Sequence, residues 1–263
     1  MINIFAVVGY KGGTGKTIAS TQILPSIILE KDDKADIRYI EIDDNNKTSK
    51  VFTASKTFTS MQSITVESSL EELQDLVFDL VVGDGDKTII IDAGGGNDTQ
   101  KVMEHIRDLE LGELATLTYI VPVKSDLAQA DNIRNMHNEK LFGNNKVIYM
   151  LNEVINIEQD KLENQFLGFF GNKKLKIPSL FIELDKPKYI AIPHTNIFDI
   201  STIKGMTIWD YARFSKNFTF AEYTIAIKKE SQDKEFFMEK IVMYEWSRRM
   251  KEYAETYLAK VEL

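Results

Sequence analysis

Short apolar runs alternate along this chain with segments whose apolar residues recur every three or four positions. The runs are rich in Ile, Val and Tyr, which is typical of strands buried on both faces of a sheet. We expect strands at 2–8, 37–42, 88–91, 116–121, 147–151 and 189–192. We expect helices at 18–30 with a kink at Pro25, at 68–82, 99–109, 125–139 and 159–169, and over most of the chain after residue 197. Residues 45–66 are expected to be loop with a marginal strand, and 177–182 to be extended.

Strand–helix alternation of this kind predicts an α/β fold, a doubly wound and mostly parallel sheet with helices on both faces and extra C-terminal helices. We expect one domain over 1–263, with 216–263 a helical extension packed on it. Ligands of such sheets bind at the carboxyl ends of the strands. Polar candidates fall at those ends: 11–17, Asp43, Asp92, Asn152 and Pro193.

Composition excludes several kinds of chemistry. The 263 residues include no cysteine, so disulfides, thiolate metal sites and cysteine nucleophiles are ruled out. The histidines His105, His137 and His194 show no spacing typical of metal ligands. No basic leader and no apolar stretch of about 20 residues is visible, so we expect a cytoplasmic protein.

The formal net charge of −8 argues against a generally basic surface for nucleic acid. The charge is unevenly spread, because 204–263 hold 11 basic and 10 acidic residues, a net of +1. A local basic patch near the C-terminal end is therefore compatible with the sequence.

A glycine-rich segment directly after the first expected strand carries the most specific chemistry. Gly9, Gly15, Lys16 and Thr17 satisfy the pattern G-x-x-x-x-G-K-[ST] of a phosphate-binding loop, or P-loop. Glycines allow backbone N–H groups to surround a phosphate, the lysine contacts the β- and γ-phosphates, and the threonine hydroxyl binds Mg²⁺. The ligand-binding set predicted here is Gly12, Gly13, Thr14, Gly15, Lys16 and Thr17, with ATP or ADP and Mg²⁺ as ligands.

Lys11 lies inside this loop, and the segment KGGTGKT resembles the deviant Walker A motif of the ParA/MinD family of P-loop ATPases. In that family the additional lysine reaches across a dimer interface to the partner's nucleotide. The resemblance implies that Lys11 acts in trans and Lys16 in cis. A solvated loop lysine is the alternative interpretation of Lys11.

Asp92 ends an isoleucine-rich strand, as the Mg²⁺-holding aspartate of a Walker B motif does. The alternative is an aspartate that caps the next helix. The following segment, 93–96, resembles the family's switch II region, although a proline often found there is absent. Glycines such as Gly95 would let backbone N–H groups approach a γ-phosphate.

Residues 41–45 occupy the place of the family's D-x-D-P-Q segment. Asp43 matches the second aspartate, which positions the attacking water, whereas Glu41, Asp44 and Asn45 depart from the pattern. A turn is the alternative, since Asp and Asn favour turns. These departures affect the expected rate of hydrolysis and not nucleotide binding.

Asn152 and Pro193 follow later strands and resemble the family's base-contacting positions, with a turn residue as the alternative for Asn152. The resemblance extends over about 2–215. It implies a weak, partner-stimulated ATPase that forms a homodimer on ATP binding. We expect a ParA-like plasmid or DNA partition ATPase that binds DNA non-specifically and uses a separate adaptor protein.

The C-terminal residues bear on these functions. Val242, Trp246, Met250, Tyr253, Tyr257 and Val261 share one helical face, and a core-packing or dimer helix explains them better than a membrane anchor. Arg248, Arg249 and Lys251 could contact DNA or form a solvated face. The rival functions are a MinD-like membrane switch, an accessory ATPase of conjugation or cargo positioning, and a non-hydrolysing nucleotide-binding scaffold.

Overall fold

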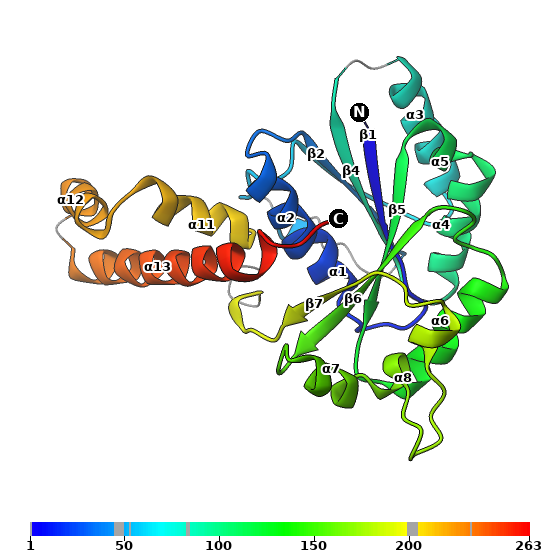
Figure 1. The fold of residues 1–263 in the computed structure, drawn as a ribbon. Helices are drawn as coiled ribbons and strands as arrows, with labels where there is room; N and C mark the ends of the chain where they lie inside the picture. Colours follow the sequence, from blue (N-terminus) through cyan, green and yellow to red (C-terminus); the bar gives the residue numbers. More distant parts are fainter. Residues whose placement is uncertain (1, 45–49, 53, 83–84, 199–204, 232) are drawn as a thin grey trace.

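A single parallel sheet organises the computed structural model, which describes residues 2–44, 50–52, 54–82, 85–198, 205–231 and 233–263 (Figure 1). Its seven strands follow the order β3-β2-β4-β1-β5-β6-β7. They are β1 (Ile2–Val7), β2 (Ile37–Ile42), β3 (Ser60–Ile64), β4 (Lys87–Ala93), β5 (Thr116–Val123), β6 (Lys146–Val154) and β7 (Tyr189–Pro193). All the pairs between these strands are parallel, so their carboxyl ends meet at one edge of the sheet.

Helical segments cover both faces of the sheet, as expected for an α/β fold (Figure 1). Those that follow β1 are α1 (Lys16–Ile18), the π-helical η1 (Ala19–Ile23) and α2 (Leu24–Lys31). The middle of the chain forms α3 (Ser69–Val82), α4 (Asn97–Asp108), α5 (Leu111–Leu114), α6 (Leu127–Asn138), α7 (Gln159–Gln165), α8 (Leu167–Phe170) and α9 (Leu180–Glu183). The last segments are α11 (Ile208–Asn217), α12 (Phe220–Glu230), α13 (Lys234–Tyr253) and the π-helical η3 (Ala254–Leu258).

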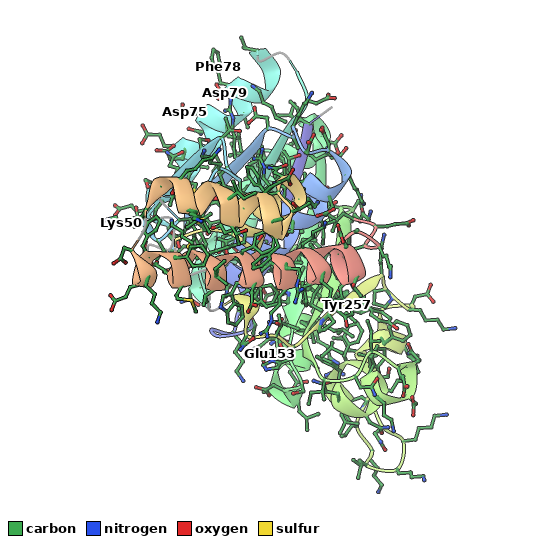
Figure 2. All side chains as sticks on the ribbon, turned by 90° about the vertical axis from the view of Figure 1, so that its left-hand side faces the viewer. Lys50, Asp75, Phe78, Asp79, Glu153 and Tyr257 are labelled. Carbon is green, nitrogen blue, oxygen red and sulfur yellow. The ribbon has the colours of Figure 1, made fainter. Side chains whose placement is uncertain are left out.

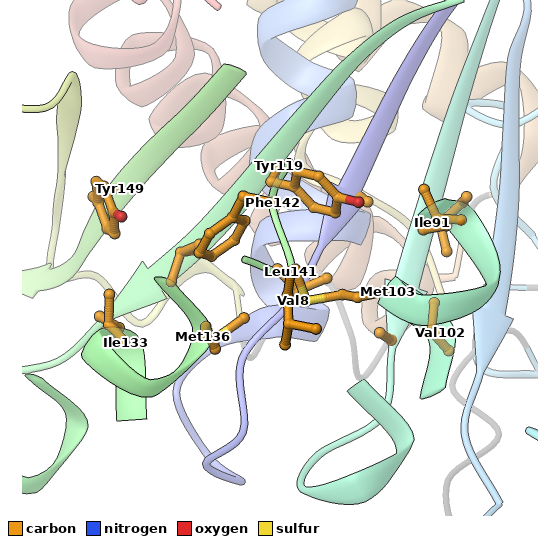
Figure 3. Packing of buried hydrophobic residues seen from close by; sticks show 14 of the residues in the cluster. Val8, Ile91, Val102, Met103, Tyr119, Ile133, Met136, Leu141, Phe142 and Tyr149 are labelled. Carbon is orange, nitrogen blue, oxygen red and sulfur yellow. The ribbon is translucent and has the colours of Figure 1, made fainter. Parts of the chain in front are cut away.

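Alternate side chains of each strand enter one of two cores, because strand side chains point to opposite faces. Ile91 of β4 packs with Val102 and Met103 of α4 in the first core, which also receives Tyr119 of β5 (Figure 3). Ile90 enters the second core, with α2, α11 and the end of α13. Asp92 lies two residues after Ile90 on the same strand, so its side chain is on the same face of the sheet and points toward the helix that follows the P-loop.

The helix expected at 18–30 is interrupted by the π-helical segment η1. Pro25 lies in the first turn of α2 and has no N–H to donate to the preceding turn. The predicted kink at Pro25 therefore takes the form of a widened turn just before it. This turn carries Ser20 and Gln22, which are both fully buried.

Other expectations on element type need correction. The piece expected to be extended at 177–182 has one isolated bridge at Ile177 and then the helix α9. Ser179 starts that helix, since its hydroxyl accepts a hydrogen bond from the Ile182 N–H. The helix expected at 159–169 is divided into α7 and α8 at Phe166. Asn45, 46–49 and 199–204 lie outside the described residues.

Helices α11, α12 and α13 (208–253), here called the helical arm, extend away from the sheet on the side of α2 (Figure 1). Residue 216, where we expect the extension to begin, lies within the last turn of α11. Met250 and Tyr253 are buried in the second core, which confirms the core-packing interpretation for these two residues. Val242, farther out on α13, is 47% exposed. Seen from the side of the arm, exposed Phe78 of α3 lies at the periphery (Figure 2).

Candidate functional site

The glycine-rich loop between β1 and α1 adopts a conformation that its glycines make accessible. Gly13 has φ +71° and Gly15 has φ +94°, in the left-handed region that favours glycine. Space around Gly12 and Gly13 is open, with no atom within 4 Å of a hypothetical Cβ. The loop thus leaves room beside its own backbone at the start of α1, where backbone N–H groups favour an anion.

Asn152 of β6 packs against the backbone of this loop. Its Nδ2 donates to the Thr14 carbonyl at 3.2 Å, and a Cβ on Gly15 would lie 2.0 Å from the same nitrogen. Asn152 is 6% exposed. The structure therefore brings Asn152 against the loop backbone, a contact that the sequence prediction of a base-contacting residue did not include.

Lys16 is buried within the loop, and its Nζ donates to the carbonyl of Gly9 at 3.2 Å and of Lys11 at 3.4 Å. Burial lowers the pKa of Lys16, while the nearby carboxylates of Asp92 and Asp43 oppose that shift. The ammonium group is thus held at the loop by weak neutral acceptors, which a phosphate oxygen could replace with a charge-assisted bond.

Asp92 of β4 is buried next to this lysine and is held by two hydroxyl groups. Ser20 of η1 donates to Asp92 Oδ2 at 2.7 Å, and Tyr39 of β2 donates to the same oxygen at 3.1 Å. Burial raises the pKa of Asp92 to about 6, although both hydrogen bonds and Lys16 lower it. Burial also raises the pKa of Tyr39, with Asp92 adding to the shift, so Tyr39 remains a hydrogen-bond donor.

A cavity of about 320 Å³ lies in front of the loop and the strand ends. It brings together eight of the predicted site residues and six others. The lining residues are Gly12, Gly13, Gly15, Lys16, Thr17, Ile18, Glu41, Asp43, Asp92, Ala93, Gly94, Gly95, Lys124 and Glu153. This volume has the scale of ligand pockets in general, which begin at about 300 Å³.

The segment after Asp92, residues 93–96, is hydrogen-bonded to the end of β2 and to the P-loop. The Gly94 N–H donates to the Ile42 carbonyl at 2.7 Å, and the Gly96 N–H donates to the Tyr10 carbonyl at 2.6 Å. A Cβ on Gly95 would lie 3.6 Å from the Gly12 nitrogen. Gly95 is therefore placed against the backbone of the P-loop.

Carboxylates gather on the other wall of the cavity. Glu41 pairs in register with Asp92 on the neighbouring strand and is 2% exposed, and Asp43 follows at the strand end. Burial raises the pKa of Asp98, and the charges of Asp44 and Asp43 raise it further. The acidic wall faces Lys16, so a cation or a polarised water would be favoured there.

Four predicted residues do not line the cavity: Thr14 and Asn152, which contact each other as described above, and Lys11 and Pro193. Lys11 forms an ion pair with Asp126, the residue that caps the N-terminus of α6. Pro193 ends β7, and its carbonyl accepts a hydrogen bond from the Tyr253 hydroxyl at 3.1 Å. In this single chain Lys11 is held away from the cavity by its own chain.

Sequence reasoning missed several residues of the site. Lys124 and Glu153 line the cavity and form an ion pair at 2.9 Å. Lys124 directly follows β5 and Glu153 is the next-to-last residue of β6, so the rule that ligands bind at the carboxyl ends of strands could have found them. Ser20 and Tyr39 had no comparable signal, because only the tertiary structure brings them to Asp92.

The residues present fit a magnesium–nucleotide complex. Open space beside Gly12 and Gly13, an ammonium at Lys16, a hydroxyl at Thr17 and a carboxylate at Asp92 border one cavity. Oxygen donors of this kind suit Mg²⁺, which takes its other ligands from phosphates and water. Together, the fold and the site define a parallel α/β protein with a P-loop after its first strand.

The basic cluster predicted for DNA lies on α13. Arg248 and Arg249 are exposed, and Arg249 lies over the Trp246 ring at 5.0 Å. Lys251 is within 3.9 Å of Glu255. Among the described residues no helix is long and apolar enough to cross a membrane.

Comparisons with known proteins give a likeness of fold. No known family model matches the chain, and no curated protein matches it. Among solved structures, the chain is similar to a proposed plasmid partition protein from Borrelia burgdorferi B31 bound to AMPPNP. The two share 13% identity with a TM-score of 0.46, over 94% of this chain and 98% of that chain. At this level of similarity we infer function only from the residues of this chain.

Proposed function

We propose that this protein is a molecular switch that binds ATP with Mg²⁺, dimerises on binding it and hydrolyses it slowly. The observation that carries this proposal is the shared cavity of the P-loop, Lys16 and Asp92. The dimer is inferred from Lys11, because a second lysine in such a loop is the feature that resembles the ParA/MinD family.

Each residue of the site has a distinct proposed role. The N–H groups of 12–17 and Lys16 bind the phosphates, while Thr17 and Asp92 hold the metal. Bound Mg²⁺ would supply charge neutralisation at the phosphates. Asp43 would orient the attacking water, and the Gly95 N–H would donate to the terminal phosphate. Asn152 and Pro193 are assigned to the base side by the resemblance.

Lys11 has to leave Asp126 to act in trans. Its ammonium is partly exposed, with 43% of the side chain accessible, so exchange of partners is physically easy. A partner's nucleotide phosphates would offer a more strongly charged acceptor than one carboxylate. We infer that ATP-dependent dimerisation replaces the Lys11–Asp126 pair.

Partition of plasmid or other DNA, with an adaptor protein, is the more specific function that we propose for this switch. It rests on the sequence resemblance and on the exposed Arg248 and Arg249 of α13. A second candidate is a scaffold that binds nucleotide without hydrolysis. Glu41 favours it, because it replaces an aspartate of the family's motif and lies buried beside Asp92.

The first experiment measures binding of a fluorescent ATP analogue and the molar mass by light scattering, with Mg²⁺ or EDTA. We expect wild-type protein to bind nucleotide and dimerise. Lys16→Ala should weaken binding roughly 10- to 100-fold, the range for a lost charged hydrogen bond. Lys11→Ala should retain nucleotide binding and remain a monomer.

Two further measurements separate the rival functions. Phosphate release above background supports the ATPase, whereas a persistent ATP dimer without release supports the scaffold. Salt-sensitive binding of non-specific duplex DNA by the dimer supports partition. A dimer that ignores DNA would favour a membrane or protein-cargo switch, and a monomer under all conditions would contradict the role of Lys11 in trans.

A further inference from the structure

A buried polar cluster joins three distant segments at the N-terminus of α11. We call it the α11 hub, and it consists of Gln22, Ser55, Thr57, Thr207 and Asp210. Apart from Ser55, which is partly exposed, all its members are at most 6% exposed. Buried polar groups of this kind keep a fixed arrangement, because each lost hydrogen bond leaves an unsatisfied partner.

Asp210 organises the hub through its carboxylate. Ser55 Oγ donates to Oδ2 at 2.5 Å, the Lys56 N–H donates to Oδ1 at 2.9 Å, and the Thr207 N–H donates to Oδ2 at 3.0 Å. The Thr57 and Thr207 hydroxyls lie 2.5 Å apart. The segment 55–57 is therefore bonded to the first turn of α11.

Gln22 connects the same turn to the helix that follows the P-loop. Its Oε1 accepts a hydrogen bond from the Ile208 N–H at 2.8 Å. Gln22 lies in η1, two residues beyond Ser20, which is one of the two donors to Asp92. The first connection from Asp92 to α11 thus runs along a single helical turn.

The other donor to Asp92 leads to the hub by a second connection. The Tyr39 ring packs against the Phe58 ring, with centroids 5.5 Å apart. Phe58 directly follows Thr57, whose hydroxyl contacts Thr207. Both residues that donate to Asp92 Oδ2 are therefore linked to the start of α11, Ser20 through Gln22 and Tyr39 through Phe58 and Thr57.

The hub also continues outward into the helical arm. Ser247 of α13 donates to the Tyr211 carbonyl, and its Oγ accepts from the Ser215 N–H at 2.9 Å. Trp209 and Tyr211 of α11 share the second core with Met250 and Tyr253. Helices α11 and α13 lie side by side (Figure 1), so a displacement of the first turn of α11 would move α13 with it.

We propose that Tyr39 and Thr207 are positioning residues for Asp92, and that through them the helical arm is energetically coupled to the metal site. This inference rests on the proposed function, because it needs a nucleotide–Mg²⁺ complex at Asp92. Coupling is reciprocal, so a partner that fixes the arm changes metal affinity by the same factor by which metal changes its binding. The arm is then the element that reports nucleotide occupancy.

The test measures the Mg²⁺ concentration that gives the half-maximal response of a bound fluorescent ATP analogue. We expect this midpoint to rise roughly 10-fold in Tyr39→Phe, the lower end for loss of a group that orients a metal ligand. Thr207→Val should raise it about threefold, within the range for remote coupling. The double variant should show less than the product of the two effects.

Two controls isolate the coupling from general damage. Thr219→Val removes a hydroxyl that caps α12 in the same arm but lies outside the hub, and it should leave the midpoint unchanged. Thr207→Ser keeps the hydroxyl and should restore the wild-type midpoint. Nucleotide affinity in EDTA should be the same in all variants, which excludes a damaged P-loop.

A second readout needs no bound metal. In the nucleotide-free protein, amide hydrogen exchange at 208–213 should be faster in Tyr39→Phe than in the wild type, because a ring that no longer donates to Asp92 can shift against Phe58. Equal Mg²⁺ midpoints in wild type, Tyr39→Phe and Thr207→Val, with normal nucleotide binding, would overturn this inference alone. Absence of nucleotide binding by the wild type would overturn the proposed function and the inference with it.

Discussion

Asp92 shows how one residue can carry opposing demands. The proposed role as a metal ligand requires an ionised Asp92, whereas burial favours the neutral acid and raises the pKa of Asp92 to about 6. Ser20 and Tyr39 offset part of this cost by donating to Oδ2. The site is therefore close to a protonation change at physiological pH, and a bound cation would favour the ionised form.

The Mg²⁺ affinity should depend on pH for this reason. Below about pH 6 the proton competes with the metal, so the Mg²⁺ midpoint for nucleotide binding should rise about tenfold per pH unit. Raising the Mg²⁺ concentration should shift the transition to lower pH. Asp92→Asn corrects for titration of the nucleotide itself, and an equally steep pH profile in that variant would contradict this prediction.

Stability of the metal-free protein should change in the opposite direction. Between the ordinary value of 3.8 and the folded pKa of about 6, the native state binds a proton at Asp92 that the unfolded chain does not. The free energy of unfolding should therefore fall as pH rises through this window, by on the order of 3 kcal/mol from this group. Urea unfolding with EDTA at several pH values measures this, with Asp92→Asn as the variant that lacks the titrating group. The loss of stability in the wild type relative to this variant should grow as pH rises and should vanish below pH 3.8, where Asp92 is protonated in both states.

At the scale of elements, α13 has two different halves. Its C-terminal turns place Met250 and Tyr253 in the second core, whereas Val242 lies on the projecting part of the arm. The apolar stripe of the sequence is continuous across both halves. The apolar spacing in the sequence defines the stripe. How much of the stripe is buried depends on how far the second core extends along α13.

Paired substitutions on α13 should reveal this division. Met250→Ala removes a fully buried side chain and should lower the free energy of unfolding by about 2–5 kcal/mol. Val242→Ala, on the same stripe but 47% exposed, should change it by about 0.5 kcal/mol or less. Denaturant unfolding monitored by tryptophan fluorescence measures both, and equal losses would show that the arm packs against something further.

At the scale of the whole molecule, Lys11 and Asp126 connect the P-loop to α6. Asp126 also caps that helix by accepting from the Ala128 N–H at 2.9 Å. Tyr10, the neighbour of Lys11, donates to Glu139 at the other end of α6 at 3.0 Å. Two adjacent side chains of the loop thus contact one helix, and the proposed action of Lys11 in trans requires only the Lys11–Asp126 contact to break.

Asp126→Asn should therefore strengthen ATP-dependent dimerisation. Asparagine keeps the helix cap, so the change removes mainly the ion pair with Lys11. An exposed pair of this kind contributes up to about 1 kcal/mol, so the dimer dissociation constant should fall about two- to fivefold. Sedimentation equilibrium with an unhydrolysed ATP analogue measures this, and a weaker dimer would indicate that Asp126 acts within the interface.

The sequence by itself determined the parallel α/β fold, the P-loop and the residues at the strand ends. These features depend on local patterns, because alternating periodicity and glycine spacing act within a few residues. Only the tertiary structure decided that Ser20 and Tyr39 meet at Asp92, that Lys124 pairs with Glu153, and that Lys11 is held by Asp126. Such contacts join residues far apart in the chain, and their side-chain directions follow from strand register and helix packing, which no local pattern specifies.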